Sequence, residues 1–380
     1  MNRGFEVPGL RGPIRLQPSD FFAGAAVSPF KATEAEQLVQ YFKLAKKIAA
    51  GARFVVTQLG YDARKFHETL QWMRSRHRGI PLVGNIYILP CGAARLMNRN
   101  GVPGCVVTDK LLAALEDERQ AADKGERARL LRAARLYAIL KGMGYDGVHI
   151  GGHNLTCQQV EAVIDEGEAL TPQWPELVRY FDDPQPEGFY LYERDSLTGL
   201  NSGQLTERKG RRLDAPVSWS YGISRRMHRW LFEPQRPLFR LMRGVCRAVD
   251  GSSGEGLFHK LEHLLKVLLF DCRDCGDCAL TDVAYLCPMS RCPKNQRNGA
   301  CGGSLNGWCE VHPGQRQCIY VLAYARLKAS GEEGCLGEGA VPACHWDLYQ
   351  RSSWINFYLG RDHTARRMGI PEIVKKGDKG

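Results

Sequence analysis

Eight cysteines lie between residues 272 and 318 in a spacing that could bind metal. They are Cys272, Cys275, Cys278, Cys287, Cys292, Cys301, Cys309 and Cys318. The first ten residues, MNRGFEVPGL, contain no apolar core of signal-peptide length, which predicts a chain that stays in the cytoplasm. Thiols in that reducing compartment seldom form structural disulfides, so the clustering predicts metal ligation.

The spacing within the cluster narrows the choice of metal but leaves two possibilities. The first three cysteines form a CxxCxxC run, and a proline follows both Cys287 and Cys292, features typical of [4Fe–4S] ferredoxin segments. Cys287 lies farther along the chain than the ferredoxin spacing, so four-cysteine zinc remains the alternative. Eight thiols could hold two four-ligand centres. Four cysteines outside the cluster are interpreted as small buried hydrophobes: Cys91, Cys105, Cys157 and Cys246.

The overall composition is that of a globular protein of 380 residues, long enough for two domains. The formal net charge is +11, but the basic residues are dispersed among acidic ones and have no accompanying aromatic pattern. This distribution argues against nucleic-acid binding and favours an anionic cofactor, a polyglutamate tail or an acidic protein partner. No segment has the ~18 consecutive apolar residues that a membrane span needs.

The first half of the chain alternates strand-like and helix-like segments, which predicts a parallel sheet built from βα units. Strands are predicted at residues 21–27, 54–58, 81–89 and 147–151. Helices are predicted at residues 33–50, 62–77, 126–143 and 155–166. Because a closed barrel of this type uses eight parallel strands, four units predict half of a (β/α)8 TIM barrel. The other half is expected from a partner chain or from an upstream part of the reading frame.

The positions of these segments predict five regions and one strand-end site. The regions are a leader at 1–20, a partial barrel at 21–170, a linker with wrapping helices at 171–255, a small cysteine-rich metal-binding α+β domain at 256–363 and a basic tail at 364–380. A short amphipathic helix at 256–270 leads into the cysteines. Gln58 stands at the carboxyl end of the second strand, where parallel barrels place ligand-contacting groups. Its amide can form two hydrogen bonds with a heterocycle.

Several motifs resemble the methylenetetrahydrofolate reductase family. In the first half these are GAAVSPF, KKIAAGA, FVVTQLGYD, PLVGNIYIL, NRNGVPGCVV and GYDGVHIGG. In the second half, CRDCGDC, CPMSRCPK, NGACGGSLNGWCEV and SSWINFYLGRDH are similar to the cysteine-rich domain that accompanies such reductases in some bacteria. The resemblance implies a TIM-barrel flavoprotein that interconverts methylene- and methyl-tetrahydrofolate by hydride transfer through FAD or FMN.

The resemblance also implies roles for individual residues. Gln58 matches the glutamine that contacts the folate pterin, Ala25 and Val27 match positions that line the flavin, and Lys47 matches a basic residue near it. The cysteine-rich domain would carry iron–sulfur or zinc centres and receive electrons from partner proteins. In the family, the glutamate acid and a flavin-contacting aspartate lie on earlier strands and have no counterpart here. No catalytic residue is therefore assigned. The lone chain is expected to have little or no activity. The alternative is a non-catalytic, zinc-stapled scaffold that docks a partner reductase.

Overall fold

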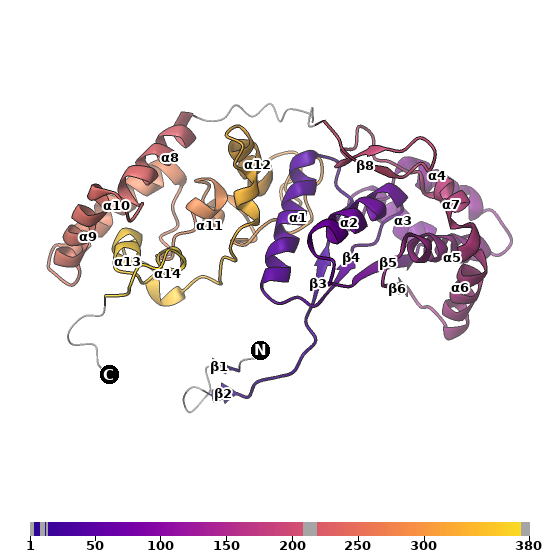
Figure 1. Ribbon diagram of the computed structural model, residues 1–380, viewed down its shortest axis with the longest axis horizontal. Coiled ribbons are helices and arrows are strands. Elements are labelled where there is room, and N and C mark those ends of the chain that lie inside the picture. Colours follow the sequence, from indigo (N-terminus) through magenta and orange to yellow (C-terminus); the bar gives the residue numbers. More distant parts are fainter. Residues whose placement is uncertain (1–3, 8–11, 13, 208–218, 374–380) are drawn as a thin grey trace. The chain divides into compact units, whose positions relative to one another are not determined.

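The computed structural model describes residues 4–7, 12, 14–207 and 219–373, and the chain divides into two compact units (Figure 1). Unit 1 comprises residues 1–30, 47–184 and 190–206. Unit 2 comprises residues 31–46, 185–189 and 207–380. Among the described residues, no helix is long and apolar enough to cross a membrane.

Unit 1 is built on a parallel sheet with the strand order β3-β4-β5-β6. The strands are β3 (Gly24–Val27), β4 (Phe54–Thr57), β5 (Leu82–Ile88) and β6 (Gly147–Gly152). They match the four predicted strands, because runs of aliphatic and β-branched residues favour the extended backbone. The sheet of described residues has four strands and does not close on itself.

Three helices of unit 1 begin where a polar side chain caps the first turn. Asp62 accepts a hydrogen bond from the Arg64 backbone N–H at 2.9 Å and starts α2 (Ala63–Arg76). Thr156 and Gln159 form a reciprocal capping box at the start of α6 (Cys157–Leu170). The remaining helices are α3 (Cys91–Asn98), α4 (Asp109–Glu118), α5 (Glu126–Met143) and α7 (Trp174–Leu177). Two antiparallel pairs complete the unit: β1 (Phe5–Val7) with β2 (Ile14–Leu16), and β7 (Tyr192–Arg194) with β8 (Asn201–Leu205).

One face of the parallel sheet is covered by helices and the other is more open. Along β5, Leu82, Gly84, Ile86 and Ile88 are buried, whereas the alternating residues are only half-buried. A Cβ atom on Gly84 would lie 2.6 Å from Leu140 of α5, so this helix packs closely against the covered face. Side chains of alternate residues point to opposite faces of a strand, so the intervening positions face the open side.

Unit 2 is helical, with irregular segments that carry the cysteines. Its helices are α1 (Glu34–Ala49, of which residues 34–46 belong to this unit), α8 (Trp219–Leu231), α9 (Pro237–Val249), α10 (Glu255–Phe270), α11 (Pro288–Arg291), α12 (Ile319–Lys328), α13 (Ser353–Tyr358) and α14 (His363–Arg367). Its described residues contain isolated bridges between Leu305, Trp308 and Gln317 but no named strand. The expected α+β character is corrected accordingly, because the glycine-rich loops between the cysteines are too irregular to pair as strands.

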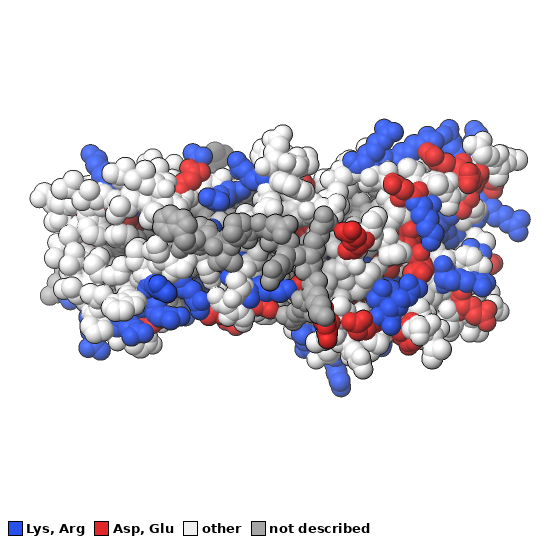
Figure 2. All heavy atoms as spheres, turned by 90° about the horizontal axis from the view of Figure 1, so that it is seen from above, with Lys and Arg blue, Asp and Glu red and all other residues white. Residues whose placement is uncertain are grey.

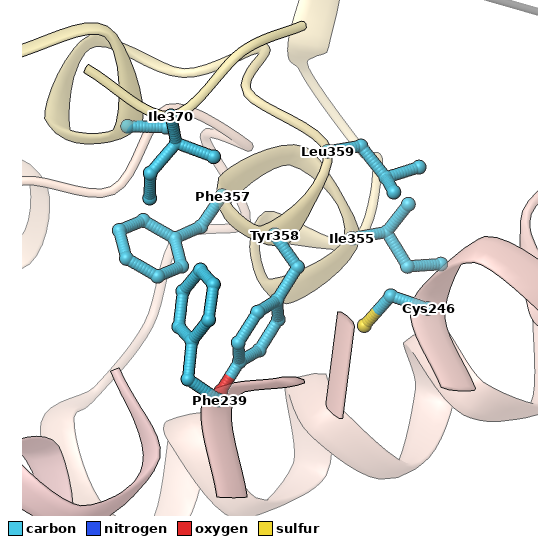
Figure 3. Close-up of a cluster of buried hydrophobic side chains, with 8 residues drawn as sticks. Phe239, Cys246, Ile355, Phe357, Tyr358, Leu359 and Ile370 are labelled. Carbon is cyan, nitrogen blue, oxygen red and sulfur yellow. The ribbon is translucent and has the colours of Figure 1, made fainter. Parts of the chain in front are cut away.

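A compact hydrophobic cluster joins α9 to the two last helices of unit 2 (Figure 3). Its buried members are Phe239, Cys246, Ile355, Phe357, Tyr358, Leu359, Ala365 and Ile370. The rings of Phe239 and Tyr358 lie 5.1 Å apart, and the Tyr358 hydroxyl donates a hydrogen bond to the Leu231 carbonyl at 2.7 Å. This cluster fixes α13 and α14 against α9. It thereby also fixes the Ser352–His363 segment, which reaches the cysteine loop.

Candidate functional site

The eight clustered cysteines fall into two groups of four. Cys272, Cys275, Cys278 and Cys287 line one cavity of about 20 Å³, together with Lys266 and other residues. A cavity of this size holds one or two water molecules. Four thiolates are the donor set of structural zinc sites and of iron–sulfur clusters.

The second group lines a separate cavity, also of about 20 Å³. Its cysteines are Cys292, Cys301, Cys309 and Cys318. The chain passes from one group to the other through the single turn of α11, which has Cys287 at its start and Cys292 at its end. Cys287 lines the first cavity and Cys292 lines the second.

The sulfurs surround these cavities without converging on one point. Within the described part of the chain, no group of three or more His, Cys, Asp and Glu side chains is close enough to hold a metal ion. Instead, the Cys275 thiol donates to the Asp277 carbonyl at 3.5 Å and the Cys301 thiol to Glu310 at 3.2 Å. Burial raises the pKa of Cys278 and of Cys318 to about 11. A metal ion would have to displace these protons and draw the sulfurs inward, as coupled binding and folding requires.

A buried charge network supports the loop that carries the first group. Asp277 lies between Cys275 and Cys278 and has no exposed surface. Its carboxylate accepts from Arg297 Nη2 at 2.9 Å, from the His363 backbone N–H at 3.1 Å and from His363 Nδ1 at 2.6 Å. The CRDCGDC and GRDH motifs are thus joined by direct contact.

His363 is held protonated by two carboxylates. Its second ring nitrogen, Nε2, lies 3.0 Å from Asp282 Oδ2. Burial alone would lower the pKa of His363, but the hydrogen bonds to Asp277 and Asp282 outweigh it and raise that pKa to about 9. Burial opposes the charge on Asp277, yet the His363 and Arg297 contacts hold the pKa of that carboxyl below its usual range. At neutral pH the imidazolium therefore donates to both aspartates.

Helix α1 and Lys31, three residues before it, support the loop of the second group, although the sequence pattern assigned that helix to the barrel. Lys31 Nζ donates to the carbonyl of Ser304 at 2.6 Å and to that of Gly302, and Lys43 Nζ donates to the carbonyl of Ala300 at 2.8 Å. These carbonyls flank Cys301 on both sides. Burial lowers the pKa of Lys31. The sequence offered no local signal for these contacts, because more than 250 residues separate the partners.

In unit 1, the predicted folate and flavin residues lie at one end of the parallel sheet. Gln58 directly follows β4; its backbone N–H donates to the Val27 carbonyl at 2.7 Å, and its side-chain oxygen accepts from the Leu59 N–H at 2.9 Å. Lys47 Nζ donates to the Ala26 carbonyl at 2.6 Å. The structure therefore brings Lys47 and Gln58 to the carboxyl ends of β3 and β4.

The side chains of these residues do not all point to the same face. Ala25 and Val27 pair with Val55 and Thr57, which are buried on the helix-covered face. Val27 is itself only 3% exposed. By strand alternation Gln58 lies on the open face. A ligand on that face would therefore meet Ala25 and Val27 through their backbone alone.

The open face carries a further polar pair that the sequence analysis did not select. Asn85 of β5 and His149 of β6 are register partners, and His149 Nδ1 lies 3.2 Å from Asn85 Oδ1. The Asn85 backbone N–H also donates to the Thr57 hydroxyl at 3.0 Å. An asparagine within an aliphatic strand, PLVGNIYIL, is the signal that could have found this pair. With Gln58, these groups could hydrogen-bond a flat heterocycle.

Comparison with known proteins identifies both halves of the chain. A family model described as methylenetetrahydrofolate reductase matches residues 14–163, which include the whole parallel sheet. A second, described as methylene-tetrahydrofolate reductase C terminal, matches residues 252–347, which include all eight clustered cysteines. No curated protein matches the chain. The two matches extend over more than half of the 380 residues and confirm the resemblance of the motifs. The chain therefore joins a methylenetetrahydrofolate reductase domain to the C-terminal domain of such reductases, which supports a reductase-like role in folate metabolism.

Proposed function

We propose that this protein is a component of a flavin-dependent methylenetetrahydrofolate reductase whose C-terminal domain carries metal centres for electron transfer or docking. The observation that carries the proposal is the division of eight cysteines into two cavities of four, in a chain matched by both family models. A chain that joins a folate-reducing domain to thiolate-bound centres is suited to bring electrons to the reduction.

For the identity of the metal, we propose [4Fe–4S] clusters, with zinc as the second candidate. The CxxCxxC run supports a cluster, and Lys266 Nζ lies 3.6 Å from the Cys278 sulfur, where it can donate a hydrogen bond that tunes a cluster potential. The small cavity volume favours a single zinc ion instead. Zinc has no redox chemistry, so it would make the domain a docking scaffold for a partner reductase.

For the reductase domain, we propose that Gln58 hydrogen-bonds the folate pterin on the open face of the sheet, with Asn85 and His149 beside it. Lys47 and the backbone of β3 would contact the flavin. FAD or FMN supplies the hydride-transfer chemistry when bound, and this chain's residues orient the two rings. The edge strands β3 and β6 are available to a partner protein that would complete the barrel.

The metal proposal is tested on protein purified without oxygen, by elemental analysis and a visible absorption spectrum. We expect about four or eight iron atoms per chain, with matching sulfide, since each four-thiolate set holds one cluster. Cys275→Ser and Cys292→Ser should each remove one centre, whereas Cys105→Ser, outside both cavities, should remove none. One or two zinc atoms without colour would support the scaffold, and unchanged metal content in both cluster variants would refute the ligand assignment.

The folate proposal is tested by binding of tetrahydrofolate to the full chain, followed by tryptophan fluorescence. Gln58→Ala should weaken binding about fivefold, because one lost hydrogen bond in a partly buried site is worth roughly 1 kcal/mol. Gln204→Ala is the matched control, since Gln204 is exposed in unit 1 and lies on β8. Equal dissociation constants for Gln58→Ala and wild type would contradict the role of Gln58.

A further inference from the structure

Helix α10 points its polar side chains inward and its leucines outward. Glu262 and Lys266 are almost fully buried in unit 2, with 3% and 6% of their surface exposed. Four leucines on the outer face are more than half exposed: Leu257 (65%), Leu261 (55%), Leu264 (56%) and Leu268 (74%). This is the reverse of the usual arrangement of an amphipathic helix on a globular protein.

Hydrogen bonds from residue 352, just before α13, and from the first residues of α13 hold α10 in the orientation that buries its polar side chains. The Glu262 carboxylate accepts from the Ser353 hydroxyl at 2.7 Å, from the Trp354 N–H at 3.3 Å and from the Ser352 hydroxyl. Lys266 Nζ donates to the Ser353 hydroxyl at 2.5 Å. Because turning the helix would break all of these bonds, the leucines cannot move into the core of unit 2.

The exposed leucines have the spacing of a helix-pairing seam. Successive members of the stripe Leu257, Leu261, Leu264 and Leu268 are separated by four, three and four residues. Leu257 and Leu264, and likewise Leu261 and Leu268, are seven residues apart, which is the repeat of coiled-coil contacts. The steps read the same in both directions. An antiparallel copy of the helix would therefore place Leu257 opposite Leu268 of the second copy, and Leu261 opposite its Leu264.

The stripe continues into a wider apolar surface. Leu265 and Leu269 border a cavity of about 280 Å³ whose other wall includes Met227 and Phe232. Of the 27 large hydrophobic residues exposed in the described part of the chain, 13 lie between residues 223 and 269. Figure 2 shows uncharged surface at the end of unit 2 with α8, α9 and α10, interrupted by Lys and Arg side chains. A surface of this kind marks an interaction site.

We propose that α10 pairs with α10 of a second copy of this chain, in antiparallel orientation about a two-fold axis. Self-complementarity of the seam is the condition for such an isologous contact, and the palindromic spacing meets it. The alternative occupant, a lipid surface, is less favoured because α10 exposes a single basic residue, Lys260, and the arginines of the region lie on α8 and α9. Helices that bind membrane surfaces carry several basic residues on the same helix.

Sedimentation of the full chain tests this proposal. The wild type should show a mass that rises with concentration from 42.6 kDa towards twice that value. The double variant Leu261→Lys with Leu264→Lys brings like charges face to face across the two-fold axis and should weaken the dimer at least a hundredfold. Leu197→Lys is the matched control, because Leu197 is 94% exposed in unit 1 and should leave the mass unchanged. Far-ultraviolet circular dichroism checks that the double variant keeps its helices.

Two results would overturn the proposal. The first is a monomeric wild type at about 100 µM, where a dimer with a micromolar dissociation constant is largely formed. If that monomer floated with phosphatidylglycerol vesicles and the double variant did not, the face would be assigned to lipid. The second is a dimer that the double variant retains, which would place the contact elsewhere on the chain.

Discussion

Replacing His363 by glutamine should remove a pH dependence of folding stability that the buried aspartates create. His363 Nδ1 and Nε2 lie 2.6 Å from Asp277 and 3.0 Å from Asp282, and the residue is only 7% exposed. These contacts raise the pKa of His363 to about 9, against an ordinary value of 6.5. Each difference of one in pKa corresponds to about 1.4 kcal/mol, so the protonated ring contributes about 3 kcal/mol to the free energy of unfolding.

The direction of the effect follows from which state holds the proton. Below pH 6.5 the imidazole is protonated in both the folded and the unfolded chain, and the full contribution is present. Between pH 6.5 and 9 the unfolded chain releases this proton while the folded chain keeps it, so stability falls as pH rises. Above pH 9 the folded protein also loses the proton and the contribution is gone. Asp362, with a pKa that burial raises to about 6, titrates below this window.

Urea unfolding at pH 6, 7.5, 9 and 10 measures the effect, with tryptophan fluorescence of the C-terminal domain as the signal. Over this pH range the free energy of unfolding of wild type should fall by about 3 kcal/mol more than that of His363→Gln, since titrations of other groups are common to both proteins. Asp282→Asn provides a second comparison. Removal of this carboxylate should lower the pKa of folded His363, so the fall in stability should end at a lower pH than in wild type. Parallel pH profiles for wild type and His363→Gln would refute the assignment of the proton to this network.

Two further predictions concern the loops that carry the cysteines. Gly276→Ala should destabilise unit 2 by several kcal/mol, because Gly276 has a φ of +70° and an added Cβ atom would meet the Leu348 carbonyl at 1.7 Å. Gly331→Ala, with a φ of +68° and no atom within 4 Å, should cost only about 1–2 kcal/mol in the same melting experiment; equal losses would show that the clash is relieved. Lys31→Met should leave two buried carbonyls unpaired, cost about 2 kcal/mol and lower the metal content of the Cys301 group only; loss of metal from both groups would contradict this separation.

The sequence predicted most of the regular structure of unit 1, because the information for it is local. The strand Leu82–Ile88 is an aliphatic run, and the helix that begins at Cys157 has its capping box at Thr156 and Gln159. Such short-range patterns decide where an element begins and ends. They also identified the cysteine cluster, which is defined by spacing along the chain.

Contacts between distant segments could not be predicted in the same way. Helix α1 has the period of a barrel helix, yet its Glu34 accepts from the Tyr324 hydroxyl at 2.7 Å and Lys31 binds the loop after Cys301. Periodicity shows that a helix has an apolar face, but it does not show which segment covers that face. The division of the cysteines likewise depends on the direction in which α11 turns the chain, which spacing alone does not give.

For helix α10, the sequence pattern did not show that its apolar face is exposed. The pattern GLFHKLEHLLKVLLF predicts an amphipathic helix, and for an isolated domain it predicts that the leucines are buried. Full burial of a leucine is worth about 1.5–3 kcal/mol, so four leucines left more than half exposed forgo roughly 4–7 kcal/mol. The buried pair of Glu262 and Lys266 offsets little of this, because the desolvation of two charges consumes most of their attraction. A second surface that covered the leucines would recover this free energy, and the hydrogen bonds from Ser352 and Ser353 keep the leucines exposed to such a surface.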